Sequence, residues 1–105
     1  MALDVLKRFE GKQRILITPG IVDLGAKLEE YNMNLGIQAA ESADYVILVG
    51  EKQAKPIKKG LETKKYPNNQ LFIAKDINEA IKKMQEIANK DTVVLLENDL
   101  PDNYL

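Results

Sequence analysis

One stretch decides the fold: residues 14–25 read RILITPGIVDLG. Residues 14–18 are predicted to form a strand, because aliphatic and β-branched side chains without polar alternation are typical of a parallel strand buried on both faces. The run ends abruptly at Pro19 and Gly20, where the chain turns. Ligands of open α/β sheets bind outside the carboxyl ends of the strands, so the loop 18–25 is a candidate functional loop. The alternative is a turn that only joins strand to helix.

The rest of the chain alternates strand-like and helical segments with short connections, which is typical of an α/β domain with a mainly parallel sheet. A proline at position 56 suits the first turn of a helix, and Asp76 is well placed to cap the helix that follows it. We therefore expect one three-layer α/β/α, Rossmann-like domain over residues 1–105 with at least four strands. The predicted strands are 14–18, 45–49, 71–74 and 92–96, and the predicted helices are 1–10, 26–42, 56–65 and 77–89.

Apolar spacing predicts which side of each helix faces the core. The first helix has no capping residue before it, which suggests the middle of a unit whose beginning lies elsewhere. Gly60 costs the third helix about 1 kcal/mol relative to Ala. The predicted inward residues are Leu3, Leu6 and Phe9 in the first helix, Leu28, Tyr31 or Asn32, Leu35, Ala39 and Ala40 in the second, and Ile77, Ala80, Ile81, Met84 and Ile87 in the last.

The composition excludes several kinds of chemistry. The 105 residues include no cysteine and no histidine. Disulfides, thiol nucleophiles, Ser-His-Asp triads and nearly all transition-metal sites are therefore excluded, and we expect no metal site. Carboxylates, lysines, hydroxyls and backbone amides remain for binding and catalysis.

The charge balance gives no global attraction to nucleic acid or to an anionic membrane. Fifteen basic and sixteen acidic residues leave a net charge of -1. No apolar run approaches the ~20 residues that cross a bilayer, and the amino terminus lacks a signal-peptide pattern, so a cytoplasmic protein is expected. Six lysines in one amphipathic segment are interpreted as a solvated helix face: Lys52, Lys55, Lys58, Lys59, Lys64 and Lys65.

Glycine-rich phosphate loops are absent from the sequence. Neither G-x-G-x-x-G nor G-x-x-x-x-G-K-[ST] occurs, since Gly11 and Lys12 are followed by Gln13 and preceded by no matching glycine. The chain is therefore expected to hold no nucleotide cofactor by itself. A phosphoacceptor receiver domain would need an acidic cluster at the strand ends. The first strand ends in Thr18 and Pro19, which argues against that class of protein.

Two acidic features could carry chemistry. Asp23 lies in the first loop, and Glu97, Asp99 and Asp102 follow the last strand. If both strands point the same way, these loops share one rim of the sheet, where paired carboxylates could hold Mg²⁺ or a substrate ammonium. The alternative is a solvated tail with turn and capping aspartates.

Several motifs together resemble the C-terminal domain of the Mur ligases, in particular the branch that adds D-alanyl-D-alanine to the UDP-N-acetylmuramoyl-tripeptide. Residues 15–25 are similar to a strand followed by the loop T-P-G-M-[VI]-E-L-G, with Asp23 in place of the usual Glu. The similarity continues through residues 32–40, and residues 43–51 are similar to the family's A-D-x-V-I-L-V-G. Residues from 61 onward, including 91–96, keep the family's order, so the resemblance covers nearly the whole chain.

The resemblance implies one domain of a larger, three-domain, ATP- and Mg²⁺-dependent ligase of peptidoglycan biosynthesis. In that family an acyl phosphate forms on the nucleotide-sugar peptide, and the amine of an amino acid or dipeptide attacks it. A central domain carries the P-loop, and the C-terminal domain closes over it and positions nucleotide and amino substrate. This comparison leaves the family's opening strand, with its N-x-N-P turn, outside the chain. An exposed sheet edge and self-association are then expected.

The resemblance also implies which residues position substrate or nucleotide, and it has two departures. Asn32 stands where the D-alanyl-D-alanine-adding enzymes often have His, and residues 96–99 read LEND where those enzymes have K-G-S-R. A paralogue with another amino substrate is therefore an alternative, as is a non-catalytic, stand-alone α/β interaction or small-ligand-binding module. The expected positioning residues are Thr18, Pro19, Gly20, Asp23, Asn32, Glu97 and Asn98; no catalytic residue is assigned.

Overall fold

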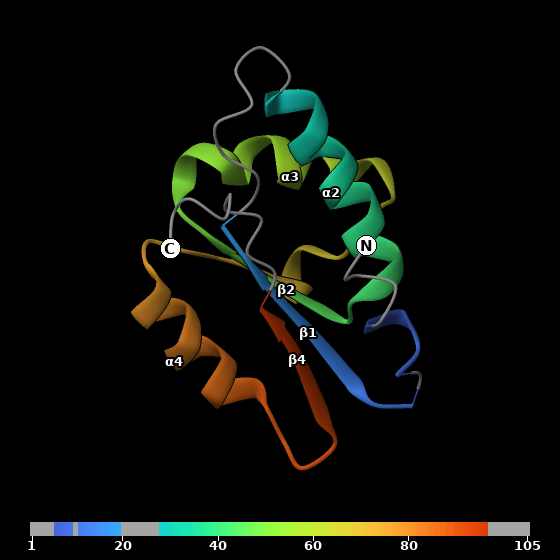
Figure 1. Cartoon of the computed structure of the whole chain (residues 1–105), viewed down its shortest axis with the longest axis vertical. Coiled ribbons are helices and arrows are strands. Elements are labelled where there is room, and N and C mark those ends of the chain that lie inside the picture. Colours follow the sequence, from blue (N-terminus) through green and yellow to red (C-terminus); the bar gives the residue numbers. More distant parts are fainter. Residues whose placement is uncertain (1–5, 10, 20–27, 97–105) are drawn as a thin grey trace, which may run out of the picture.

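The structure is a computed structural model that describes residues 6–9, 11–19 and 28–96. Its centre is a sheet of four parallel strands in the order β3-β2-β1-β4 (Figure 1). The predicted parallel α/β fold is therefore confirmed. The strands are β1 (Gln13–Thr18), β2 (Tyr45–Val49), β3 (Leu71–Ala74) and β4 (Thr92–Leu96).

Helices cover both faces of this sheet and make three layers. Helices α2 (Leu28–Ser42) and α3 (Glu51–Thr63) lie on one face, and α4 (Ile77–Ile87) lies on the other (Figure 1). Successive side chains of a strand point to opposite faces, so each central strand supplies both cores. Leu16, Val46 and Leu48 pack with α2 and α3, whereas their neighbours Ile15, Ile17 and Ile47 pack toward α4. Because the central strands are buried on both faces, their sequences are continuous apolar runs.

Helices α2 and α3 approach each other through two glycines. A Cβ atom on Gly36 would overlap the carbonyl oxygen of Ile57, and a Cβ atom on Gly60 would overlap the carbonyl oxygen of Met33. Only glycine permits this backbone contact. This close approach explains why glycine occurs at position 60 although glycine has a low helix propensity.

The predicted start of the third helix was wrong. Helix α3 begins at Glu51, directly after Gly50, and Pro56 lies inside it rather than in its first turn. The buried side chains of Ala54, Ile57 and Leu61 recur at helical spacing and extend the packed face ahead of the proline. That burial outweighs the one main-chain hydrogen bond that a proline removes.

The predicted inward face is confirmed for α2 and is wrong at Phe9. In α2, Asn32 is fully buried and Tyr31 is exposed, so the face of α2 that packs on the sheet includes the polar residue of the two. Phe9, predicted to face inward, is exposed, whereas Leu6 is buried. Leu3 lies outside the described residues, and the structure gives no burial for Leu28.

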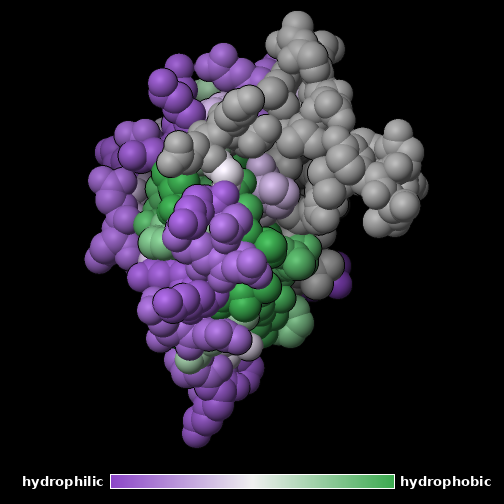
Figure 2. Space-filling view, turned by 90° about the vertical axis from the view of Figure 1, so that its left-hand side faces the viewer, coloured by the Kyte–Doolittle hydropathy of each residue, from purple (hydrophilic) through white to green (hydrophobic). Residues whose placement is uncertain are grey.

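Helix α4 buries less than its sequence suggests. It ends at Ile87 instead of residue 89, because Ala88 is extended, and Asp76 caps it as predicted by accepting a 2.8 Å hydrogen bond from the Glu79 amide. Ala80 is buried and Met84 half-buried, but Ile77 and Ile81 are exposed. The reason is that α4 contacts mainly β2 and β3. Figure 2, which views the side of the molecule where α4 lies, shows apolar surface between hydrophilic side chains.

An ion pair joins β1 to the start of β2. Asp44 accepts hydrogen bonds from the Arg14 main-chain amide at 2.9 Å, from Nε at 3.0 Å and from Nη2 at 3.1 Å. Beside it, the Tyr66 hydroxyl donates to the Ala43 carbonyl at 2.9 Å. The hydrogen bond from the Arg14 side chain is the main reason why the pKa of Asp44 lies below its ordinary value of 3.8, and partial burial opposes this shift.

This shift predicts an acid-dependent loss of stability. A lowered pKa in the folded state contributes stability above the unfolded-state pKa, and the contribution disappears as pH falls through the folded-state pKa. We expect Asp44→Asn to lower the free energy of unfolding at pH 7 by about 1 kcal/mol, since the Asp44 side chain is 44% exposed and solvent screens the pair. Urea unfolding of both proteins should show this difference shrinking below the ordinary pKa of 3.8. A difference that is the same at pH 7 and in acid would contradict the assignment.

Candidate functional site

The sheet order creates a topological switch point between β1 and β4. From β1 the chain passes through α2 to β2 and then to β3 on one side, whereas β4 pairs with the other side of β1. The strand order therefore reverses beside β1: the connection from β1 to β2 includes α2 on one face, and the connection from β3 to β4 includes α4 on the other face. Such a point is where open α/β sheets bind their ligands.

The carboxyl ends of β1 and β4 lie side by side. Leu96, the last residue of β4, is paired with Ile17, and Thr18 follows as the last residue of β1. The loops that carry the predicted positioning residues thus leave neighbouring strands. Gly20, Asp23, Glu97 and Asn98 themselves lie outside the described residues.

Thr18 and Asn32 are the two described members of the predicted site that are fully buried. Thr18 is paired with Leu48 on β2, and Asn32 lies near the beginning of α2. No buried side-chain nitrogen or oxygen among the described residues lacks a hydrogen-bond partner, so both polar groups are satisfied. In the sequence Thr18 precedes segment 20–27 and Asn32 follows it, and Pro19, directly before that segment, is half-buried.

Buried polar groups of this kind fix local geometry. A third buried polar residue, Ser42, donates its hydroxyl to the Gln38 carbonyl one turn earlier, a local contact of the helix. Burial of a threonine hydroxyl and an asparagine amide is favourable only when their hydrogen bonds are made. Thr18 and Asn32 therefore fix the local geometry of the end of β1 and of the first part of α2.

The connection after β2 reaches the same end of the sheet. Gly50 has a φ of 90° and donates its amide to the Ala74 carbonyl at 2.8 Å, which ties the end of β2 to the end of β3. Helix α3 starts at the next residue. A side chain at position 50 would be strained by this backbone conformation, which explains the glycine.

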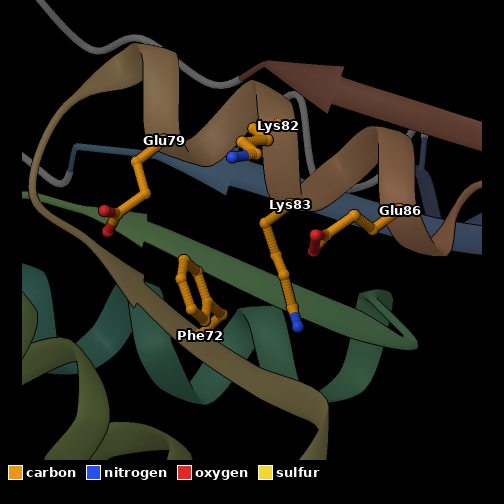
Figure 3. A pocket seen from close by; sticks show the side chains of 5 residues that line it. All are labelled: Phe72, Glu79, Lys82, Lys83 and Glu86. Atoms are coloured by element: carbon orange, nitrogen blue, oxygen red, sulfur yellow. The ribbon is translucent and has the colours of Figure 1, made fainter.

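Two hollows that the sequence did not indicate lie along β3, away from the predicted site. One, of about 280 Å³, is lined by Phe72 and by charged side chains of α4 (Figure 3). The other, of about 380 Å³, lies between Ile73 and the first part of α3, where Lys55 and Lys58 line it. Both are open to solvent, and neither contains a predicted site residue. The prediction of solvated lysines is confirmed for Lys55, Lys58, Lys59, Lys64 and Lys65, which are exposed on α3 and the turn after it, whereas the side chain of Lys52 is not described.

The described residues offer no prepared metal site and no membrane span. Within residues 6–9, 11–19 and 28–96, no three acidic side chains gather as a metal-ion cluster. In the same part of the chain, every helix is too short or too polar to cross a bilayer.

In comparisons with known proteins, no protein-family model and no curated protein matches this chain.

Proposed function

We propose that this chain is the C-terminal, substrate- and nucleotide-positioning domain of an ATP-dependent ligase of peptidoglycan biosynthesis. The proposal rests on the resemblance of the loop TPGIVDLG, residues 18–25, to the corresponding loop of Mur ligases. Its main structural support is that this loop leaves β1 at the switch point beside β4. In this proposal the whole enzyme is cytoplasmic and joins an amino acid or dipeptide to a nucleotide-sugar peptide.

The proposal divides the chemistry between domains. ATP and Mg²⁺ belong to the central domain, since this chain has no phosphate-binding loop and no three-carboxylate cluster within its described residues. The acyl group becomes activated as an acyl phosphate there, and the attacking amine displaces phosphate to form the new amide bond. This domain closes over the cleft and excludes water from the acyl phosphate.

The rim after β1 and β4 then faces the cleft. Asp23 or Glu97 orients the ammonium or amine of the incoming substrate, and the turn at Gly20 lets main chain approach the ligand. Thr18 and Asn32, which precede and follow this loop in the sequence, are fully buried. Fixed positions for the elements that flank the loop favour a fixed geometry for the reacting groups.

The isolated chain is expected neither to hydrolyse ATP nor to bind it tightly, because its binding determinants lie on the other domain. Titration calorimetry with Mg-ATP and a phosphate-release assay measure both properties. Micromolar binding to the isolated chain would contradict the proposal and favour the stand-alone ligand-binding module. The gene sequence before Met1 separates the two functions independently, since the ligase requires an upstream G-x-x-x-x-G-K-[ST].

A further inference from the structure

We infer that the outer edge of β4 is a self-association surface, on which a second copy of this chain adds its own β4 in antiparallel orientation. The two four-stranded sheets then form one continuous sheet of eight strands about a two-fold axis. The sequence predicts self-association at an exposed edge without saying which edge. The structure supplies the strand, the register and the reason why the other edge is protected, and the inference is independent of the proposed ligase function.

Main-chain groups of β4 alternate between β1 and the outside. The Gln13 amide donates to the Asp91 carbonyl at 2.9 Å, and the parallel register pairs Gln13 with Thr92. In this pattern the main-chain groups of residues 91, 93 and 95 face β1, and those of 92, 94 and 96 face away. The Thr92 amide donates a hydrogen bond to the Asn89 carbonyl at 3.2 Å within the same chain. No other strand among the described residues pairs with the outer edge of β4.

The side chains of β4 do not protect this edge. Residues 92–96 read TVVLL, with no charge, proline or glycine. Val94 is 39% exposed and Leu96 is 56% exposed. Natural sheets block such edges with charged side chains, prolines or bulges, and a strand without them is a template for another strand.

The opposite edge, β3, is protected by charge on both of its faces. On the α4 face, Lys83 extends beside the Phe72 ring, with Nζ 5.1 Å from its centroid, and Glu79, Lys82 and Glu86 surround the same hollow (Figure 3). On the α3 face, Lys55 and Lys58 line the hollow beside Ile73. A strand that approached β3 would have to desolvate these charges, so pairing is favoured at β4.

A second copy is the occupant because β4 is complementary to itself. With Val94 opposite Val94 of the other copy, each Val94 amide donates to the other Val94 carbonyl, and each Leu96 amide donates to the opposing Thr92 carbonyl. The Thr92 amides, already bonded within their own chains, are not required. The two Val94 side chains meet on one face of the sheet. A net charge of -1 per chain gives little repulsion between copies.

Two matched proline variants test the edge. Val94 and Ile73 lie on the two edge strands, are 39% and 37% exposed, and both have outward-facing amides, since the Gly50 amide donates to Ala74 and so turns Ile73 away from β2. Val94→Pro removes two intermolecular hydrogen bonds per dimer but none to β1. Sedimentation over a concentration series should show the wild type and Ile73→Pro passing from one chain to two, with dimerisation of Val94→Pro weakened about tenfold or more.

Two further measurements keep the test decisive if a proline variant fails to fold. Val94→Lys places a charge on the edge without changing the main chain and should also weaken dimerisation about tenfold or more, with circular dichroism confirming its fold. In the wild type, hydrogen exchange at the Val94 and Leu96 amides should slow as the protein concentration rises. A wild type that stays monomeric when concentrated, or dimers that Ile73→Pro abolishes and both Val94 variants retain, would overturn the inference.

Discussion

Gly60→Ala should destabilise the fold, although replacing a glycine inside a helix by alanine ordinarily stabilises it. The gain in helix propensity is about 1 kcal/mol. Against it, the new Cβ would overlap the Met33 carbonyl oxygen and approach the Ile37 amide to 3.0 Å. Because these neighbours are backbone atoms of α2, relief requires the two helices to move apart. We expect a net loss of about 3 kcal/mol in the free energy of unfolding, the upper part of the usual range for overpacking.

Urea unfolding measures this loss, and Gly36→Ala should behave in the same way because its Cβ would overlap the Ile57 carbonyl. The matched control is Lys59→Ala, an exposed neighbour in the same helix, which should change the free energy of unfolding by less than about 0.5 kcal/mol. An increase in stability on Gly60→Ala would show that the helices are not in backbone contact.

Leu48→Ala should cost more than Ile47→Ala, although both residues are buried in the middle of β2. Leu48 packs with α2 and α3, whose backbone contact leaves little room for the cavity to collapse. Ile47 packs toward α4, where half-buried side chains such as Met84 can shift into the space. We expect about 4 kcal/mol for Leu48→Ala and about 2 kcal/mol for Ile47→Ala, since the cost rises with the cavity that remains.

Chemical denaturation of the two variants gives the comparison directly. Ile73→Ala, at an exposed position of β3, is the control and should cost less than either. Equal costs for Leu48→Ala and Ile47→Ala would mean that the two layers are packed equally tightly, contrary to the exposure of Ile77 and Ile81 on α4.

Local sequence patterns predicted the strands well and the helix faces less well. Strands β2, β3 and β4 have the predicted bounds, because buried runs such as YVILV are short, continuous and closed by turn residues. Pro56 misplaced the start of α3, since the buried side chains of Ala54 and Ile57 decide where that helix packs. Ile77 and Ile81 were wrongly predicted to face the core, because helical spacing does not reveal how much of a helix the sheet covers.

The candidate site was predictable in part from the same patterns. The run ending at Thr18 indicated the candidate loop, but the position of β4 beside β1 is a property of the sheet order, which no local pattern carries. Asn32 was expected as a positioning residue through the family resemblance, and its complete burial is a tertiary property. The sequence also could not distinguish the two sheet edges, because only the tertiary structure shows that charged side chains lie beside β3.

Turnover of the proposed full-length ligase, measured beside thermal stability, tests the central claim that the rim after β1 and β4 positions the substrate. Asp23→Asn and Glu97→Gln keep size and remove charge, and Glu62→Gln on the exposed side of α3 is the control. The account predicts that at least one rim variant loses turnover by about a hundredfold at an unchanged melting temperature, with the control fully active. Full turnover in both rim variants would show that these carboxylates are ordinary turn and tail residues, and would contradict the account.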